Sequence, residues 1–255
     1  TLGAATSGVV TATASGTAAE LALLTTAGTD LIAVTLSNAH TLPQLKAIND
    51  ATGGAITLND ASVDLNGSAA DVAAALTGIS SYTGNVILTT AHTLEEFNTI
   101  NTVTSGTITL HDLSGALSGT AADIISALDG ISGYTGALTA TGALTGSAGV
   151  TAVNALGDKT SGVVTATLSG TITELGSLTT AATDMIAVTA SGTQTGSAGV
   201  TALNALAGKT GGVVTATLTG TITELGSLTT VATDAIAVTA SGTQTGSAGV
   251  TALNA

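Results

Sequence analysis

Five aspartates stand at matched positions and are the side chains best suited to bind a metal ion. Calcium takes six to eight oxygen ligands within about 2.6 Å. Aspartate also favours tight turns, through hydrogen bonds to its own backbone. Equivalent aspartates on alternate strands of a sheet would lie roughly 9–10 Å apart, too far to share an ion. A turn role is therefore favoured over calcium for the two matched sets, Asp30, Asp184 and Asp234, and Asp60 and Asp112.

Three histidines are the other candidate metal ligands, and the sequence has no cysteine. His40 and His92 stand at equivalent positions before a predicted helix start, and His111 has Asp112 beside it. Zinc needs three or four ligands that converge on one point, and the lack of cysteine excludes a thiolate site or a disulfide framework. The histidines are expected at polar edge positions, and no cofactor is predicted.

Threonine pairs with one residue between them resemble the flat hydroxyl ranks of ice-binding solenoids. The intervening segments, such as 186–191 (IAVTAS), lack the second threonine, so a rank would be broken at every other strand. Threonine is also a common strand residue because it is β-branched. A strand role is therefore favoured over ice binding for Thr11 and Thr13, Thr165 and Thr167, and Thr215 and Thr217.

The sequence offers little that could support catalysis. It has no arginine, and Glu95 and Glu96 are neighbours at a predicted helix start, so their side chains point in different directions. Solenoids that cleave polysaccharides need clustered carboxylates or basic residues and aromatic sugar platforms, and aromatic residues are 1% of this chain. Repetition almost without change also argues against an active site, which needs local asymmetry. We predict that the protein is not an enzyme.

These residues lie in a repeated sequence: residues 210–255 are nearly identical to residues 160–205, which stand 50 positions earlier. Fixed-period similarity is typical of repeat architectures, in which each unit buries its apolar face against its neighbours. After residue 205 the first copy continues as LAGKT, whereas the sequence ends at residue 255 with the second copy. We therefore expect the chain to be a stretch of a longer array. Residues 160–205 and 210–255 differ at four positions, Ser161/Gly211, Ser169/Thr219, Ala181/Val231 and Met185/Ala235.

The 50-residue period divides into shorter coils. Residues 38–136 form a more diverged family, and residues 160–255 are the near-identical 50-residue repeats. No linker, charge run or change in composition interrupts the pattern, so we predict one continuous solenoid over 1–255. About ten coils of roughly 21 to 31 residues are predicted, beginning at Gly8, Leu31, Gly54, Asn85, Gly106, Ala137, Gly162, Met185, Gly212 and Ala235.

Each coil is predicted to be a short strand, a capped short helix and a turn. Alternating β-branched residues indicate the strands, and aligned strands would form a parallel sheet with right-handed crossovers. Gly176 and the threonines around it oppose a helix, so a pure right-handed β-solenoid is the alternative. Pro43 fits a first helical turn. Helix starts are predicted from Ser or Thr with an acid or amide three residues later: Thr17/Glu20, Thr41/Gln44, Ser68/Asp71, Thr93/Glu96, Thr120/Asp123 and Thr171/Glu174.

The composition excludes several classes of partner. Sixteen carboxylates against three lysines give a net charge of −13, which removes nucleic acid because phosphate binding needs a basic patch. No apolar run approaches the roughly 18 residues of a membrane-spanning helix. Hydrophobic residues are 44% and charged residues 7%, so the chain should fold around small aliphatic side chains.

Three segments resemble a known kind of repeat: 6–24 (TSGVVTATASGTAAELALL), 41–58 (TLPQLKAINDATGGAITL) and 67–79 (GSAADVAAALTGI). They are similar to the tandem arrays of very large secreted surface proteins of bacteria, notably cyanobacteria. The likeness covers essentially the whole chain. It implies a cell-surface fibre, adhesin or matrix component and brings no catalytic residues.

The sequence thus predicts an extracellular or cell-surface structural protein that forms or decorates a filament, sheath or layer. Because so few residues are charged, little repulsion keeps copies apart. The expected partner is another copy of the chain, with cell-surface polysaccharide as a further candidate. The alternative is an adhesin stalk whose binding tip lies outside this sequence.

Overall fold

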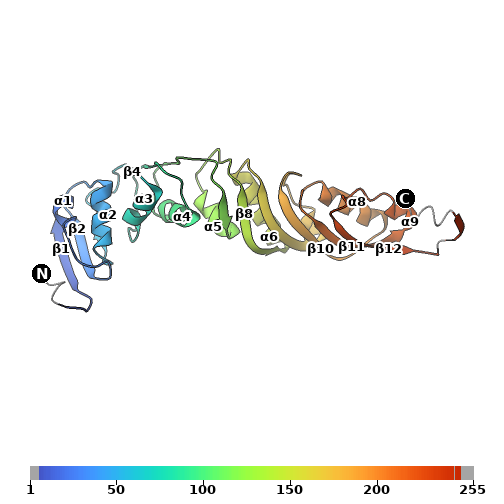
Figure 1. Ribbon diagram of the computed structural model, residues 1–255, viewed down its shortest axis with the longest axis horizontal. Helices are drawn as coiled ribbons and strands as arrows, with labels where there is room; N and C mark the ends of the chain where they lie inside the picture. The colour runs from blue at the N-terminus through green and yellow to red at the C-terminus, as the bar shows by residue number, and fades with distance from the viewer. Residues whose placement is uncertain (1–5, 244, 248–255) are drawn as a thin grey trace. The chain divides into compact units, whose positions relative to one another are not determined.

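Every strand pair between described residues is parallel, as the sequence predicts. The computed structural model describes residues 6–243 and 245–247, and within them it has twelve strands and nine helices. The strands form two sheets of three and one of six, and none of these sheets closes into a barrel within the described residues. The protein is therefore an α/β protein built on open parallel sheets (Figure 1).

The chain folds as two compact units, and unit 1 comprises residues 1–115 and 126–132. Its two sheets have the strand orders β1-β2-β3 and β4-β5-β6. Its elements are β1 (Thr11–Gly16), α1 (Ala18–Leu21), β2 (Leu31–Leu36), α2 (Leu42–Asp50), β3 (Ile56–Thr57), β4 (Leu65–Gly67), α3 (Ala69–Leu76), β5 (Val86–Leu88), α4 (Leu94–Val103) and β6 (Ile108–Thr109).

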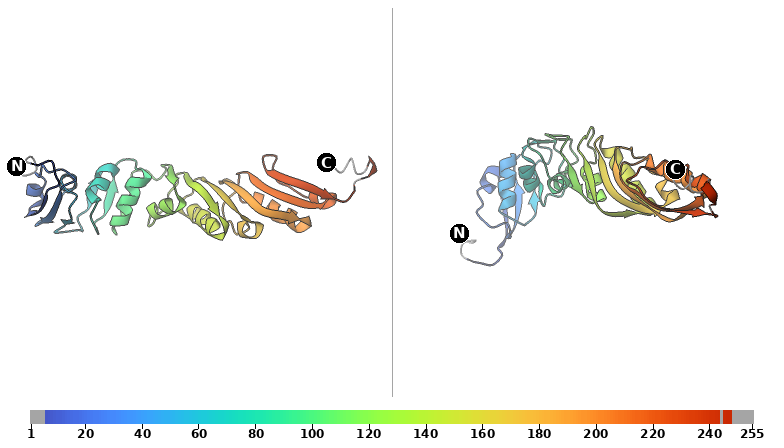
Figure 2. Two further views of the ribbon diagram at one scale, coloured as in Figure 1. Left: turned by 90° about the horizontal axis from the view of Figure 1, so that it is seen from below. Right: turned by 45° about the vertical axis from the view of Figure 1, so that its right-hand side comes forward.

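Unit 2 comprises residues 116–125 and 133–255 and holds the six-stranded sheet, in the order β12-β11-β10-β9-β8-β7. Helix α6 packs on β8 and β9, and α8 packs on β10 and β11 (Figure 2). The elements are β7 (Leu117–Gly119), α5 (Ala121–Ala127, across the unit boundary), β8 (Leu138–Thr145), α6 (Gly146–Lys159), β9 (Val164–Thr171), α7 (Ile172–Leu175), β10 (Met185–Thr195), α8 (Gly196–Ala207), β11 (Val214–Thr221), α9 (Ile222–Leu225) and β12 (Ala235–Ser241).

Neighbouring strands in each sheet are also neighbours in sequence, and we call a strand with the residues that lead to the next one a rung. Thr11 lies opposite Leu31, a spacing of 20 residues, and Leu138 lies opposite Val164, a spacing of 26. A continuous solenoid over 1–255 remains a prediction. The end of the second near-identical copy, residues 248–255, lies outside the described residues.

The predicted helix starts are confirmed. The Thr17 backbone N–H donates to Glu20 Oε2 at 2.9 Å while the Glu20 N–H donates to Thr17 Oγ1 at 3.3 Å, a complete capping box. The Thr41 N–H donates to Gln44 Oε1 at 3.0 Å, with Pro43 in the first turn. The segments with poor helix propensity form only the four-residue helices α7 and α9. The purely β alternative is therefore wrong for the described residues.

The prediction of one strand per coil is wrong for the coils that begin at Gly54 and Gly106. Each contains a second short strand, β4 in the first and β7 in the second. Between β3 and β4 the Ser62 N–H donates to Asp60 Oδ1 at 2.8 Å, and this tight turn ends one strand before the next begins. The 31-residue coils are thus long because each carries a turn and an extra strand.

The core is thin and lies between each sheet and the helices that cover one side of it. Along β9 the inward residues Val164, Ala166 and Leu168 are buried, whereas Thr165 and Thr167 between them are exposed. In unit 1 one buried cluster joins residues of α2 to α4 and β4 to β5 and includes Tyr82. Aliphatic residues make up most of the core, as the composition predicts, and Tyr82, Phe97 and Tyr134 are the largest side chains buried in it.

Candidate functional site

The matched aspartates of the first set connect successive rungs. Asp30 Oδ1 accepts a hydrogen bond from the Val10 N–H at 2.8 Å, and its Oδ2 accepts one from the Ala27 N–H at 3.0 Å. Asp184 repeats both bonds with Val164 and Ala181, at the same lengths. Asp234 repeats them with Val214 and Val231. The carboxylate therefore closes its own turn, as predicted, and also satisfies an N–H at the start of the preceding strand.

The second aspartate set forms local turns. Asp60 Oδ1 accepts from both the N–H and the hydroxyl of Ser62, and Asp112 does the same with Ser114. The Ser62 hydroxyl and N–H hold the pKa of the Asp60 carboxyl below its usual range. Among residues 6–243 and 245–247, no three His, Asp or Glu side chains come close enough to hold a metal ion.

Sequence reasoning missed a threonine that matches the aspartates in function. Thr210 Oγ1 accepts the Ile186 N–H at 2.9 Å and lies 2.7 Å from the Ile186 carbonyl oxygen. Thr52 makes the same pair of contacts with Ile32, at 2.9 and 2.8 Å. Both threonines are buried. In residues 30–52 and again in residues 184–234, aspartate and threonine thus alternate as the side chain that binds the preceding strand.

The signal for these threonines is a glycine two residues later. The Gly212 N–H donates to Thr210 Oγ1 at 2.9 Å, and a Cβ at Gly212 would overlap the Ile186 carbonyl of the preceding rung. Gly54 has the same relation to Thr52 and Ile32. The Thr-x-Gly motif therefore marks places where two rungs approach closely, at residues 52–54, 104–106, 160–162 and 210–212.

A second missed contact is an asparagine near the end of the longer helices. Asn154 Nδ2 donates to the Ser177 carbonyl at 3.0 Å, and its Oδ1 accepts the Thr179 N–H at 2.9 Å. Asn204 repeats both bonds with Ser227 and Thr229. Each asparagine satisfies backbone groups just after the next short helix, where orphan carbonyls need partners. Asn49 and Asn101 donate to carbonyls of the following helix in unit 1.

The expectation of an edge position holds for His111, which is exposed, and is wrong for His40, which is 3% exposed. His40 Nε2 lies 2.9 Å from the Tyr82 hydroxyl, which donates to the Val63 carbonyl. The hydroxyl has one proton, so Nε2 carries the proton of a neutral imidazole. Burial lowers the pKa of His40, although Asp60 opposes this effect. The rings of His92 and Phe97 pack edge to face, with their centroids 4.8 Å apart.

The outer face of the six-stranded sheet carries two of the three threonine pairs, and the third pair, Thr11 and Thr13, lies on β1. From β9 to β10 the rank of hydroxyls is broken, as predicted, because Thr165 lies opposite Met185 and Thr167 opposite Ala187. From β10 to β11 the prediction is wrong, because a register shift in β10 places Thr189 opposite Thr215 and Thr193 opposite Thr217. None of the strands β7 to β12 contains a charged residue. Three apolar side chains are also exposed at the strand starts of unit 2: Val163 (39%), Met185 (49%) and Val213 (41%).

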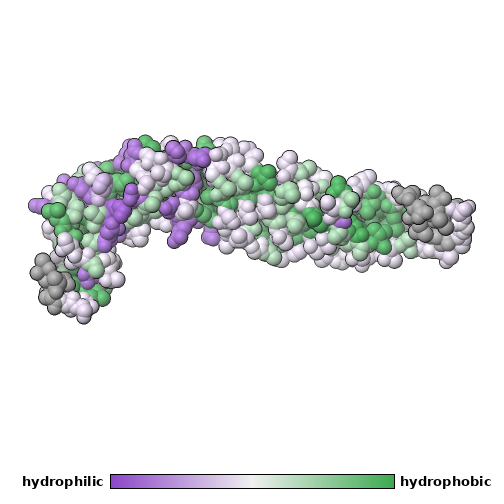
Figure 3. Space-filling view, viewed as in Figure 1, coloured by the Kyte–Doolittle hydropathy of each residue, from purple (hydrophilic) through white to green (hydrophobic). Residues whose placement is uncertain are grey.

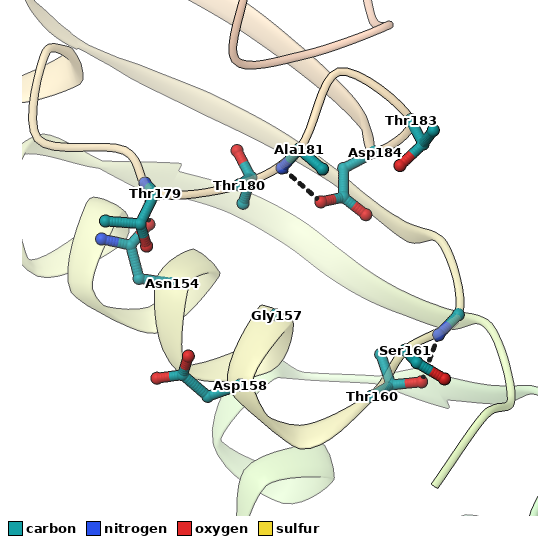
Figure 4. Close-up of a pocket in the computed structure, with 11 residues that line it drawn as sticks. Asn154, Gly157, Asp158, Thr160, Ser161, Thr179, Thr180, Ala181, Thr183 and Asp184 are labelled. Carbon is teal, nitrogen blue, oxygen red and sulfur yellow. Dashed lines mark hydrogen bonds between the residues drawn. The ribbon is translucent and has the colours of Figure 1, made fainter.

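A surface pocket of about 270 Å³ lies between the end of α6 and the turn before β10 (Figure 4). Its lining includes Asp158, Thr160, Ser161 and Asp184, and no His or Lys. Both Asp184 oxygens already accept backbone N–H groups. The pocket therefore lacks a paired acid and base or an activated nucleophile.

The chain matches no protein-family model, no curated protein and no solved structure. Among the residues that the structure describes, no helix has the length and apolar character needed to cross a bilayer. Any inference about function therefore depends on the geometry of the chain itself.

Proposed function

We propose that the protein is part of an extracellular structural solenoid whose copies associate into a filament, sheath or layer. The observation that carries this proposal is the uncharged, regular outer face of the six-stranded sheet. Thr165, Thr167 and Thr215 project from it beside exposed Met185 and Val213. Apolar side chains on such a face favour contact with another surface, and the absence of charge removes the repulsion that keeps proteins apart.

The contacts between rungs support the solenoid part of this proposal. Asp, Thr-x-Gly and Asn side chains each bind the backbone of an adjacent rung, and they recur along both units. Each rung therefore gains its stability from its neighbours, as in repeat proteins whose length is free to vary. Such a fold suits a role that depends on length and surface.

The surfaces of the two units differ in polarity. On the face drawn in Figure 3, hydrophilic residues gather over unit 1, whereas unit 2 is mainly pale or green. Unit 1 has ten carboxylates and one lysine, and unit 2 has six carboxylates and two lysines. Unit 2 is therefore the better candidate for contacts between copies.

Polysaccharide is a weaker candidate partner than another copy. Protein surfaces that bind sugars commonly offer an exposed aromatic ring for stacking. The chain has one Phe and two Tyr, and Tyr82, Phe97 and Tyr134 are each at most 1% exposed. The adhesin stalk remains the second proposed function, because the same contacts between rungs would make a stiff spacer.

The test is analytical ultracentrifugation and electron microscopy of the purified chain over a range of concentrations. We expect assemblies that grow with concentration and persist at high salt, because the outer face of the sheet has no charges to screen. A chain that stays monomeric at high concentration would rule out self-association and favour the stalk. Melting with and without a chelator tests the calcium hypothesis, and an unchanged midpoint would remove it.

A further inference from the structure

The charged residues of this chain lie outside its strands. No strand of the described residues contains a charged residue, so the sixteen carboxylates and three lysines stand in helices or in connecting segments. The chain has a net charge of −13, and two copies therefore repel each other wherever these segments meet. In unit 2 the outer face of the six-stranded sheet, opposite its helices, is free of this repulsion. Two copies of like charge can therefore approach closely through this face.

The outer face of this sheet has low relief. Within strands β8 to β11 its exposed residues are Thr, Ser, Gly, Ala143 and Met185. Met185 is the longest of them, and its sulfur lies 3.4 Å from the place that a Cβ would take on Gly211 of the next rung. The Met185 side chain therefore leans towards the next rung. A surface of short side chains allows a second sheet to pack on it, with the two sheets about 10 Å apart.

One rank of hydroxyls is unbroken across strands β8 to β11, because it includes residues outside the threonine pairs. Thr145 lies opposite Ser169, which lies opposite Thr189. Thr189 lies opposite Thr215, and neighbouring strands are about 4.8 Å apart. A hydroxyl both donates and accepts hydrogen bonds, so a rank of hydroxyls can bond an identical rank in either direction. The face is therefore complementary to the same face of a second copy.

An apolar stripe crosses the same face obliquely. Met185 lies opposite Thr165, and therefore two residues further along the sheet than Val163. The Val213 carbonyl accepts the Val188 N–H, and Val213 lies two residues further again. The three side chains of the stripe, Val163, Met185 and Val213, are exposed and stand as diagonal neighbours on adjacent strands. Burial of such a stripe favours association, and a facing copy would bring an identical stripe across it.

The outer face is large enough for a specific contact. Strands β8 to β11 have eight to eleven residues each. At about 4.8 Å between strands and 3.3 Å per residue, four strands of this length present roughly 500 Å² on each copy, or about 1,000 Å² in a pair. Specific interfaces bury about 1,000 Å² or more in total. Each further 50-residue repeat adds two strands and about 500 Å² to the pair, so association should strengthen with the number of repeats.

We propose that two copies pack the outer faces of their six-stranded sheets against each other, in two layers related by a two-fold axis. The hydroxyl rank of each copy then faces hydroxyls of the second copy, and each apolar stripe crosses its counterpart. The face repeats every 50 residues, so a copy can also overlap part of two others, which extends the assembly lengthwise. The pairing rests on the proposed function, because it names the surface and the geometry through which copies associate.

Thr189→Lys tests the pairing, because Thr189 is an exposed member of the hydroxyl rank. A lysine on each copy would place like charges in the contact, and we expect the dissociation constant from sedimentation equilibrium to rise at least about tenfold. The matched control is Ala205→Lys, which adds the same charge at an exposed position of α8, on the helix side of the sheet. It should associate as the natural chain does. An equal loss in both variants would contradict the pairing.

A thiol on the same face gives a measurement that needs no added charge. The natural chain has no cysteine, so Thr189→Cys and Ala205→Cys each carry a single thiol. We expect the alkylation rate of Thr189→Cys to fall with the fraction of unpaired chain as the protein is concentrated, because the second copy covers this thiol. The thiol of Ala205→Cys should react at one rate throughout.

Insertion of a further copy of residues 160–209 tests the dependence on length. It adds two strands to the face of each copy, and we expect the dissociation constant to fall at least about tenfold. A dissociation constant unchanged by the insertion would contradict a contact that runs along the sheet.

The outcomes separate this pairing from the proposed function. If the chain assembles but Thr189→Lys associates normally and the thiol of Thr189→Cys is not protected, the face pairing is wrong and the proposed function stands. A chain that remains monomeric overturns both. Assembly that protects the thiol of Thr189→Cys and is weakened in Thr189→Lys supports both.

Discussion

The diverged rungs of unit 1 and the near-identical rungs of unit 2 differ in the length of their strands and helices, although in both units each rung packs against its neighbours. Strands β3 to β6 are two or three residues long, and the two helices among them, α3 and α4, have eight and ten residues. Strands β8 to β12 are seven to eleven residues long, and every other helix between them has only four. Strand length is therefore not what defines the repeat.

The contacts that both units keep are the side-chain bonds between rungs. Asp30 in unit 1 and Asp184 in unit 2 accept the same two kinds of N–H, at equal distances. Thr52 and Thr210 likewise bind the preceding strand in the same way. We conclude that these bonds set the spacing of rungs, while the strands and helices between them are free to change.

The largest expected effect comes from the glycines at the close approach. Gly54→Ala and Gly212→Ala should each lower the free energy of unfolding by about 3 kcal/mol, because the added Cβ overlaps the preceding strand. Urea denaturation followed by circular dichroism measures this. Gly157→Ala is the control: a Cβ there meets only Thr180 at 4.0 Å inside a helix, so stability should rise by about 0.5–1 kcal/mol. A large effect in one unit alone would contradict the shared spacing.

A smaller loss is expected at the aspartates. Asp30→Ala and Asp184→Ala each leave two backbone N–H groups without their acceptor, which should cost about 2 kcal/mol. The same denaturation experiment applies. Exposed Asp158→Ala serves as the control and should change stability by less than about 0.5 kcal/mol. Equal stability of Asp184→Ala and the natural chain would show that the bond between rungs is not needed.

The smallest expected effect is a dependence of stability on pH that differs between the two units. Burial lowers the pKa of His40 and of His92 from the usual 6.5. Between the folded and the unfolded pKa, the unfolded chain therefore binds more protons than the folded chain. Stability should therefore fall as the pH drops below about 6.5 and go on falling towards the folded pKa. All three histidines lie in unit 1, so hydrogen exchange should show this loss there and not in unit 2.

The control for this pH effect is His40→Gln, which cannot take up the proton. It should reduce the dependence, whereas His111→Gln, at an exposed position, should leave it in place. An equal loss in both units between pH 7 and 5 would contradict a histidine origin.

Much of this fold was accessible from the sequence, because its signals are local. Thr17 with Glu20 marks a helix start within four residues, and alternating Val and Thr mark a strand. The short strand at Leu65–Gly67 was missed because three residues carry no visible alternation. It does share Leu-x-Gly-Ser/Thr with residues 168–171, which provides a signal in retrospect.

The missed site residues depend on partners far along the chain. Thr210 acts on Ile186, 24 residues earlier, and His40 is buried against Tyr82, 42 residues later. A threonine before glycine has the pattern of a turn until the neighbouring rung is placed beside it. The interactions between rungs could therefore be identified only from the structure.

The alternation of Asp and Thr-x-Gly has a genetic consequence. Recombination between the near-identical segments 160–205 and 210–255 would add or remove 50 residues, one Asp rung and one Thr-x-Gly rung together. Every bond between rungs then finds its usual partner in the shortened or lengthened product. A change in length by two rungs would therefore preserve these bonds, and we expect arrays of this type to differ in length by multiples of 50 residues.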